Sequence, residues 1–182
     1  PHPEAEKHLR AIIDSVWPSL EQLGLAENAK PDRLHFTTSI EEALAEADFV
    51  QESTPENEDI KDKVIAAISE ASRSDVVIAS STSGIPPTRL QAECKNPERM
   101  IVGHPFNPVY LIPLVEVVGG KQTAPETVRW AMEFYKYWGK TPLHCRTEIP
   151  GHLANRLQDA LQNEALQIIA DGIATTGDLD TA

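Results

Sequence analysis

The sequence predicts an α/β protein with a mostly parallel sheet, followed by the start of an all-α domain. Short runs rich in valine and isoleucine alternate with amphipathic stretches along most of the chain, which is the pattern of strands joined by crossover helices. Beyond residue 148 the apolar residues recur at helical spacing. We therefore expect an α/β domain over residues 1–148 and the beginning of a helical domain over residues 149–182.

Apolar periodicity and turn residues predict each element in order. Apolar residues at spacings of three and four predict a first helix over residues 4–23. Ser39 and Glu42 form a capping-box pattern, which predicts a helix from there to Ala47. The remaining elements expected are strands at 33–38 and 48–53, a helix at 56–71, strands at 76–80, 99–103 and 114–118, a helix at 125–138, a strand at 142–146, and a helix from residue 150 to a stop near residue 172.

Composition argues against several classes of function. The 182 residues carry a net charge of −12, which would repel a phosphate backbone, so we expect no nucleic-acid partner. No stretch approaches the ~20 consecutive apolar residues that a membrane span requires, so we expect no membrane partner. The N-terminus lacks a signal-peptide pattern, and Cys94 and Cys145 make no disulfide framework, so we expect a cytoplasmic protein.

Polar residues follow four of the predicted strands, at residues 51–57, 80–84, 103–108 and 114–117. In an open parallel sheet, ligands bind beyond the carboxyl ends of the strands, so these residues are the first candidates for a site. Each segment also has a purely structural interpretation. The serine cluster can cap a helix, and His104 can be a core imidazole bonded to a backbone carbonyl.

Glu116 and His104 give the most specific chemical indication. Glu116 lies within an apolar run at residues 114–118, where burying an unpaired carboxylate is unfavourable, and His104 is the simplest partner for it. Such a pair can remove a proton from a hydroxyl, and the hydride that must also leave needs an acceptor that no side chain supplies, which implies a nicotinamide cofactor. A serine hydrolase is the rival, but no Gly-x-Ser-x-Gly turn occurs, and the histidines show no metal-ligand spacing, so we expect no metal.

The segment Gly103-His104-Pro105-Phe106-Asn107-Pro108 resembles the histidine motif of the L-3-hydroxyacyl-CoA dehydrogenase superfamily. The resemblance extends to residues 80–83 and 114–117, and to Pro150-Gly151 followed by Asn155-Arg156-Leu157, so it covers nearly the whole chain. It implies a Rossmann-like fold, NAD as cofactor and a homodimer formed through the helical domain.

The resemblance also implies a role for each matched residue. His104 would be the general base and Glu116 its partner, while Ser83 and Asn155 would hydrogen-bond the substrate oxygen. The residues implied to contact the nicotinamide and its ribose are Glu56, Lys61, Ser83 and Asn107. From the residues alone, Lys61 would be interpreted as a solvated helix residue.

Details within the superfamily indicate a substrate. Pro105 replaces the aromatic residue usual in the CoA-specific branch, and residues 109–120 and 49–53 resemble a carnitine-oxidising branch. The implied partner is therefore a small 3-hydroxy compound, with carnitine favoured and 3-hydroxybutyryl-CoA or gulonate as alternatives. A non-catalytic, crystallin-like relative would need neither member of the histidine–glutamate pair. Phe106 and Tyr110 are candidates for an aromatic surface that receives the quaternary ammonium of carnitine.

One feature of the superfamily has no counterpart in this sequence. Its members open with a strand and a Gly-x-Gly-x-x-Gly turn that holds the cofactor pyrophosphate on a helix N-terminus. The only paired glycines here, Gly119 and Gly120, follow a strand and are typical of an ordinary turn. We therefore expect the Rossmann-like domain to lack its first β-α-β unit, and the helical domain to be cut short.

Overall fold

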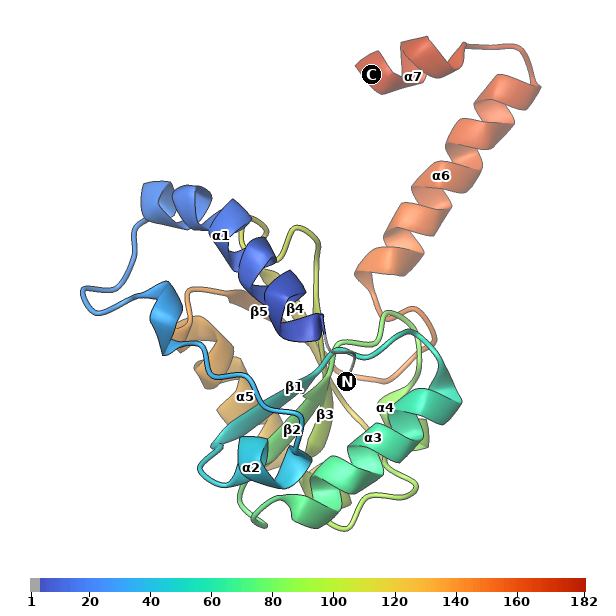
Figure 1. The fold of residues 1–182 in the computed structure, drawn as a ribbon. Coiled ribbons are helices and arrows are strands. Elements are labelled where there is room, and N and C mark those ends of the chain that lie inside the picture. The colour runs from blue at the N-terminus through green and yellow to red at the C-terminus, as the bar shows by residue number, and fades with distance from the viewer. Residues whose placement is uncertain (1–3) are drawn as a thin grey trace.

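The structure, a computed structural model, describes residues 4–182 (Figure 1). Five strands form one sheet in the order β1-β2-β3-β4-β5. Their bounds are β1 Phe49–Glu52, β2 Val77–Ser80, β3 Met100–Pro105, β4 Leu114–Gly119 and β5 Thr141–Cys145. The pairs β1–β2, β2–β3 and β4–β5 are parallel and β3–β4 is antiparallel, so the predicted mostly parallel sheet is confirmed.

Helices cover both faces of the sheet. On one face α5 (Pro125–Tyr137) packs through Ala131 and Tyr135 onto alternate residues of β2, β3 and β4. On the other face α3 (Glu58–Ala71) and α4 (Pro87–Leu90) pack onto the residues between them, through Ile65 and Leu90 among others. All four residues of β2 are buried, as expected for a central strand with an apolar layer on each face. The fold is therefore Rossmann-like.

The remaining helices lie at the two ends of the described chain and between the strands. They are α1 Ala5–Leu23, the 3-10 turns η1 Pro31–Arg33 and η2 Pro97–Arg99, α2 Ile40–Leu44, α6 Ala154–Ala170 and α7 Thr176–Thr181. In Figure 1, α6 extends away from the sheet and α7 lies at its far end. No helix within residues 4–182 is both long and apolar enough to cross a membrane.

Two predictions about local structure are wrong. The strand predicted at 33–38 is absent: η1 occupies Pro31–Arg33 and the next residues belong to no strand. A strand needs a neighbour for its backbone hydrogen bonds, and no strand of the described chain pairs with this segment. The helix predicted to reach Ala47 ends at Leu44, although the Ser39 hydroxyl accepts from the Glu42 amide as the capping pattern indicates.

Candidate active site

His104 and Glu116 face each other across the antiparallel strands β3 and β4. They are register partners, so their side chains lie on the same face of the sheet. His104 Nδ1 lies 2.9 Å from Glu116 Oε2, and the two residues are 5% and 0% exposed. The structure therefore brings together the two residues that the sequence pairs.

Glu116 is held by the start of α6 as well as by the histidine. Its Oε1 accepts from the Leu153 amide at 2.9 Å and the Ala154 amide at 2.8 Å. Burial alone would raise the pKa of Glu116, but the hydrogen bonds from His104 and from the two amides outweigh it and hold that pKa below its ordinary value. The carboxylate is therefore ionised and accepts the Nδ1 proton of His104, which leaves Nε2 to meet a ligand.

His104 lines a cavity of about 360 Å³ at the carboxyl ends of β1, β2 and β3. The residues that line it are Ser53, Ser81, Ser83, His104, Pro105, Phe106, Asn107 and Val109. The Phe106 ring lies beside the base, with a centroid separation of 4.6 Å from His104. Of the residues predicted for the site, Ser83, Asn107 and Phe106 thus share this cavity with the histidine, and Tyr110 is not part of its lining.

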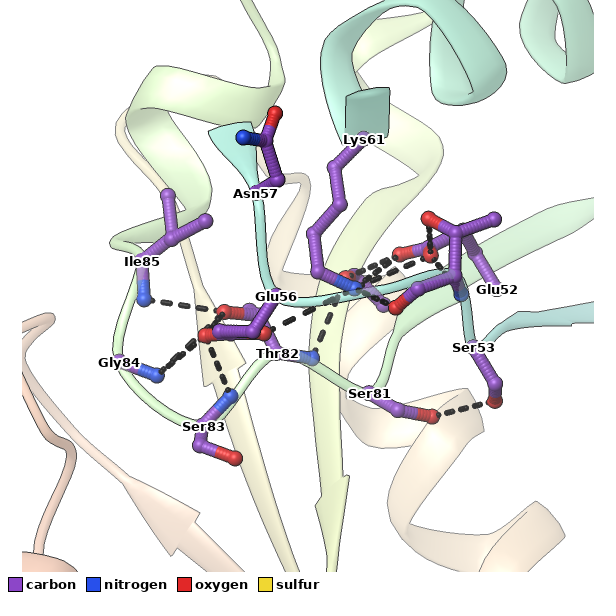
Figure 2. A network of polar contacts seen from close by, with 12 residues as sticks. Glu52, Ser53, Glu56, Asn57, Lys61, Ser81, Thr82, Ser83, Gly84 and Ile85 are labelled. Carbon is purple, nitrogen blue, oxygen red and sulfur yellow. Dashed lines mark hydrogen bonds and ion pairs between the residues drawn. The ribbon is translucent and has the colours of Figure 1, made fainter. Parts of the chain in front are cut away.

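The loop that bears Ser83 is held from two sides. Glu56 Oε1 accepts from the Thr82 hydroxyl at 2.6 Å and from the amides of Ser83 and Gly84 at 3.0 and 3.2 Å (Figure 2). From the other side, Asn155 Nδ2 donates to the Ser83 carbonyl at 2.9 Å. Glu56 and Asn155 therefore fix the backbone that places the Ser83 side chain at the cavity.

Lys61 is buried, at 1% exposure, so its interpretation as a solvated residue is wrong. Its ammonium donates to both oxygens of Glu52, at 3.0 and 3.2 Å, and to the Thr54 carbonyl at 3.0 Å (Figure 2). A second carboxylate, Glu56 Oε2, lies 3.8 Å away. Lys61 shares a helix face with the buried Ile65 and with residue 68, and that spacing was the available signal of its burial.

Glu52 is the residue of this network that no sequence argument singled out. It ends β1, and its Oε2 also accepts from the Ser80 hydroxyl at 2.5 Å. Burial would raise the pKa of Glu52, but hydrogen bonds from Ser80, Thr54 and Lys61 hold it below its ordinary value. Unlike Glu116, Glu52 lies at the end of its strand between Gln51 and Ser53, so no apolar run in the sequence marked it as buried. His152, buried in the turn before α6, was also missed, and no pattern in the sequence marks it.

Gly103, which precedes the base, provides space for a cross-sheet contact. A Cβ at this position would overlap the Tyr135 hydroxyl, which donates to Gln51 Oε1 at 2.6 Å. Gln51 Nε2 in turn donates to the Gly103 carbonyl at 3.0 Å and to the Ser81 hydroxyl at 2.8 Å. The absence of a side chain at Gly103 therefore permits a hydrogen-bond network that joins the carboxyl ends of β1, β2 and β3 beside the cavity.

A mostly parallel sheet with a glutamate-paired histidine at the carboxyl edge fits a nicotinamide-dependent dehydrogenase domain, since ligands bind at that edge and the base needs a hydride acceptor beside it. Residues 2–149 match the family described as 3-hydroxyacyl-CoA dehydrogenase, NAD binding domain, and the chain belongs to this family. It is 55% identical to L-carnitine dehydrogenase of Pseudomonas aeruginosa and 53% identical to that of Burkholderia mallei, in each case over 100% of this chain and 57% of the relative. The chain thus spans a little over half the length of these relatives.

Solved structures show the same relationship. The chain resembles 5-formyl-3-hydroxy-2-methylpyridine 4-carboxylic acid 5-dehydrogenase, an NAD-dependent dismutase, with a TM-score of 0.91 at 37% identity, over 99% of this chain and 59% of that one. It resembles 3-hydroxybutyryl-CoA dehydrogenase of Escherichia coli K12 with a TM-score of 0.85 at 33% identity, over 95% and 37% of the two chains. The predicted superfamily is therefore confirmed.

Proposed function

We propose that this chain forms the NAD-binding, base-bearing part of a dehydrogenase that oxidises the 3-hydroxyl of L-carnitine to 3-dehydrocarnitine. The observation on which the proposal mainly rests is the 2.9 Å contact between His104 and Glu116 beside an open cavity. Identity of 55% to an L-carnitine dehydrogenase over the whole chain supports the choice of substrate.

The proposed reaction divides between the protein and the cofactor. His104 Nε2 takes the proton of the substrate hydroxyl, and Glu116 stabilises the imidazolium that forms. Ser83, at the cavity wall, donates a hydrogen bond to the substrate oxygen and holds it at the base. Asn155 is the second proposed donor, through the N–H of its Nδ2 that does not bond the Ser83 carbonyl. When bound, NAD would supply the acceptor for the hydride of the carbinol carbon, so that the oxidation would yield a ketone, NADH and a proton.

The residues at the cavity fit a nicotinamide nucleotide. A carboxamide needs both a donor and an acceptor, and Asn107 and Ser83 offer both at the cavity wall. Glu56, which lies against the Ser83 loop, offers carboxylate oxygens that can accept from a ribose hydroxyl. Because the Lys61 ammonium is enclosed by Glu52 and Thr54, we assign it an indirect role, in which it orients Glu56 toward the cofactor.

We predict that the 182-residue chain alone has little or no affinity for NAD. No Gly-x-Gly-x-x-Gly turn occurs in its sequence, so a helix N-terminus of that kind is lacking for the pyrophosphate, and most of the affinity for a dinucleotide depends on it. Isothermal calorimetry checks this. Nanomolar to low-micromolar binding would contradict it.

We predict that Phe106→Leu raises the KM for carnitine roughly threefold to tenfold, because a quaternary ammonium is attracted to an aromatic face. The matched control is an isostere that carries a tert-butyl group in place of the trimethylammonium, whose KM should change far less. Tyr110→Leu tests the second aromatic candidate in the same assay. Unchanged KM for carnitine in both variants would show that neither ring binds the quaternary ammonium.

A single screen separates the alternatives to carnitine. The structural similarity to a 3-hydroxybutyryl-CoA dehydrogenase makes that substrate the second candidate. NADH formation by the full-length protein is measured with carnitine, 3-hydroxybutyryl-CoA and gulonate. We expect carnitine to give the highest kcat/KM. Turnover of none of the three would favour a non-catalytic, crystallin-like role.

We further propose that the protein is a homodimer and that residues 149–182 belong to a helical domain. We also propose that it lies in a reducing, cytoplasmic compartment. Both cysteines are free, and five large apolar side chains in and around α6 are exposed: Leu153, Leu157, Leu161, Leu166 and Ile173. An exposed apolar surface of this kind is typical of a protein–protein interface, here proposed to be with a second copy of the protein. Sedimentation equilibrium of the full-length protein should give twice the monomer mass, and replacing Leu157 and Leu161 by glutamine should lower it. A monomeric parent protein would contradict the proposal.

A further inference from the structure

His152 is a buried side chain beside the proposed base that the reaction above does not use. It lies in the turn between β5 and α6, is 0% exposed, and its ring centroid is 5.5 Å from that of His104. Its φ is 49° and that of Gly151 before it is 75°, so two successive residues are left-handed. A residue other than glycine adopts this conformation only where its surroundings enforce it. The contacts of the His152 side chain are therefore candidates for what holds the turn.

This turn connects directly to the histidine–glutamate pair. The two residues after His152, Leu153 and Ala154, are the ones whose amides donate to Glu116 Oε1, at 2.9 and 2.8 Å. A shift of the turn would withdraw both donors from a buried carboxylate. The position of Glu116, and through it the orientation of His104, therefore depends on the backbone at His152.

The His152 ring has a defined partner and a defined tautomer. Its Nε2 lies 3.1 Å from the Thr82 carbonyl, which can only accept, so Nε2 bears the proton. Its Nδ1 is buried and has no partner among residues 4–182, so a proton there would be unsatisfied. Burial lowers the pKa of His152, and the charge that His104 acquires lowers it further, against the opposing effects of Thr82, Glu116 and Glu56. The ring is therefore neutral.

The carbonyl that receives this hydrogen bond belongs to the loop of Ser83. Glu56 holds that loop from the β1 side, through the Thr82 hydroxyl and the Ser83 amide (Figure 2). From the α6 side, Asn155 donates to the Ser83 carbonyl and His152 to the Thr82 carbonyl. One ring thus joins the loop at the cavity to the turn that supports Glu116.

We propose that His152 is a positioning residue, whose neutral ring donates from Nε2 to Thr82 and thereby fixes both the amides on Glu116 and the loop that bears Ser83. Its kinetic consequence rests on the proposed function. The assignment of the tautomer does not.

The kinetic test compares two variants of the full-length protein. His152→Phe keeps a ring but loses the donor, and kcat for carnitine should fall about tenfold, as expected for a lost buried hydrogen bond near a reacting group. His152→Gln keeps an N–H that can reach the Thr82 carbonyl, and its kcat should stay within about threefold of the parent, with the KM for NAD unchanged in both. Parental kcat in His152→Phe, or an equal loss in both variants, would overturn the proposal.

The second test needs neither variant to fold. Nitrogen-15 NMR of the histidine rings in the full-length protein should show a protonated Nε2 and an unprotonated Nδ1 for His152, and this state should persist to lower pH than it does in free histidine. A His152 ring that titrates normally, or that bears its proton on Nδ1, would overturn the proposal. If the parent oxidises none of the screened substrates, the proposed function fails, and this spectrum still decides the assignment of His152.

Discussion

Replacing His104 by glutamine lowers kcat/KM for the oxidation of carnitine by about 10³-fold in the full-length protein, within the range expected when a general base is lost. Glutamine has a similar reach and can still donate to Glu116, so the buried carboxylate keeps a partner. It cannot accept a proton from the substrate hydroxyl. Steady-state NADH formation measures the effect, and the KM for NAD should change little.

His144→Gln is the matched control, because His144 lies on β5, which β4 separates from the strand of His104, and is exposed. It should keep parental activity. The His104→Gln protein should unfold at the temperature of the parent within a few degrees, which separates loss of the base from loss of the fold. Normal turnover by His104→Gln would remove the proposed mechanism.

Replacing Lys61 by methionine destabilises the domain by about 3–5 kcal/mol, the range found when one partner of a buried ion pair is removed. Methionine fills a similar volume but leaves the Glu52 carboxylate, whose side chain is 0% exposed, without its cation. The free energy of unfolding in urea measures this. A loss below about 1 kcal/mol would mean that the pair behaves as a surface ion pair does.

The double variant Glu52→Gln/Lys61→Met removes both charges and should recover most of the lost stability. The same pair predicts a pH dependence. Because the folded pKa of Glu52 is below its ordinary value, its contribution is fully present above the ordinary glutamate pKa and is lost as the pH falls through the folded one. The stability difference between Lys61→Met and the parent should therefore shrink as the pH is lowered. A difference that grows would contradict this sign.

The parts of the fold that could be predicted from sequence are those decided by local pattern. The central strands β2, β3 and β4 are apolar runs that must be buried on two faces, and each lies within two residues of its predicted bounds. The pairing of His104 with Glu116 could be predicted for a related reason. An acid inside such a run needs a partner, and few residues can serve.

The parts that could not be predicted depend on neighbours distant in sequence. Residues 33–38 have a strand-like composition but find no strand to pair with among the described residues. The spacing within α3 places Lys61 on the buried face, but it does not reveal the partner of the ammonium, Glu52 at the end of β1. His152 owes its position to the carbonyl of Thr82, seventy residues away in sequence.

Whether His104 takes the hydroxyl proton is tested most directly by the pH dependence of kcat/KM for carnitine. This is measured on the parent protein and on the residual activity of His104→Gln. We expect the parent to lose activity at low pH along a limb with the slope of one proton, because the base must be unprotonated to act. This limb should be absent from the variant. The same limb in both proteins would assign the proton transfer to another group and contradict the account.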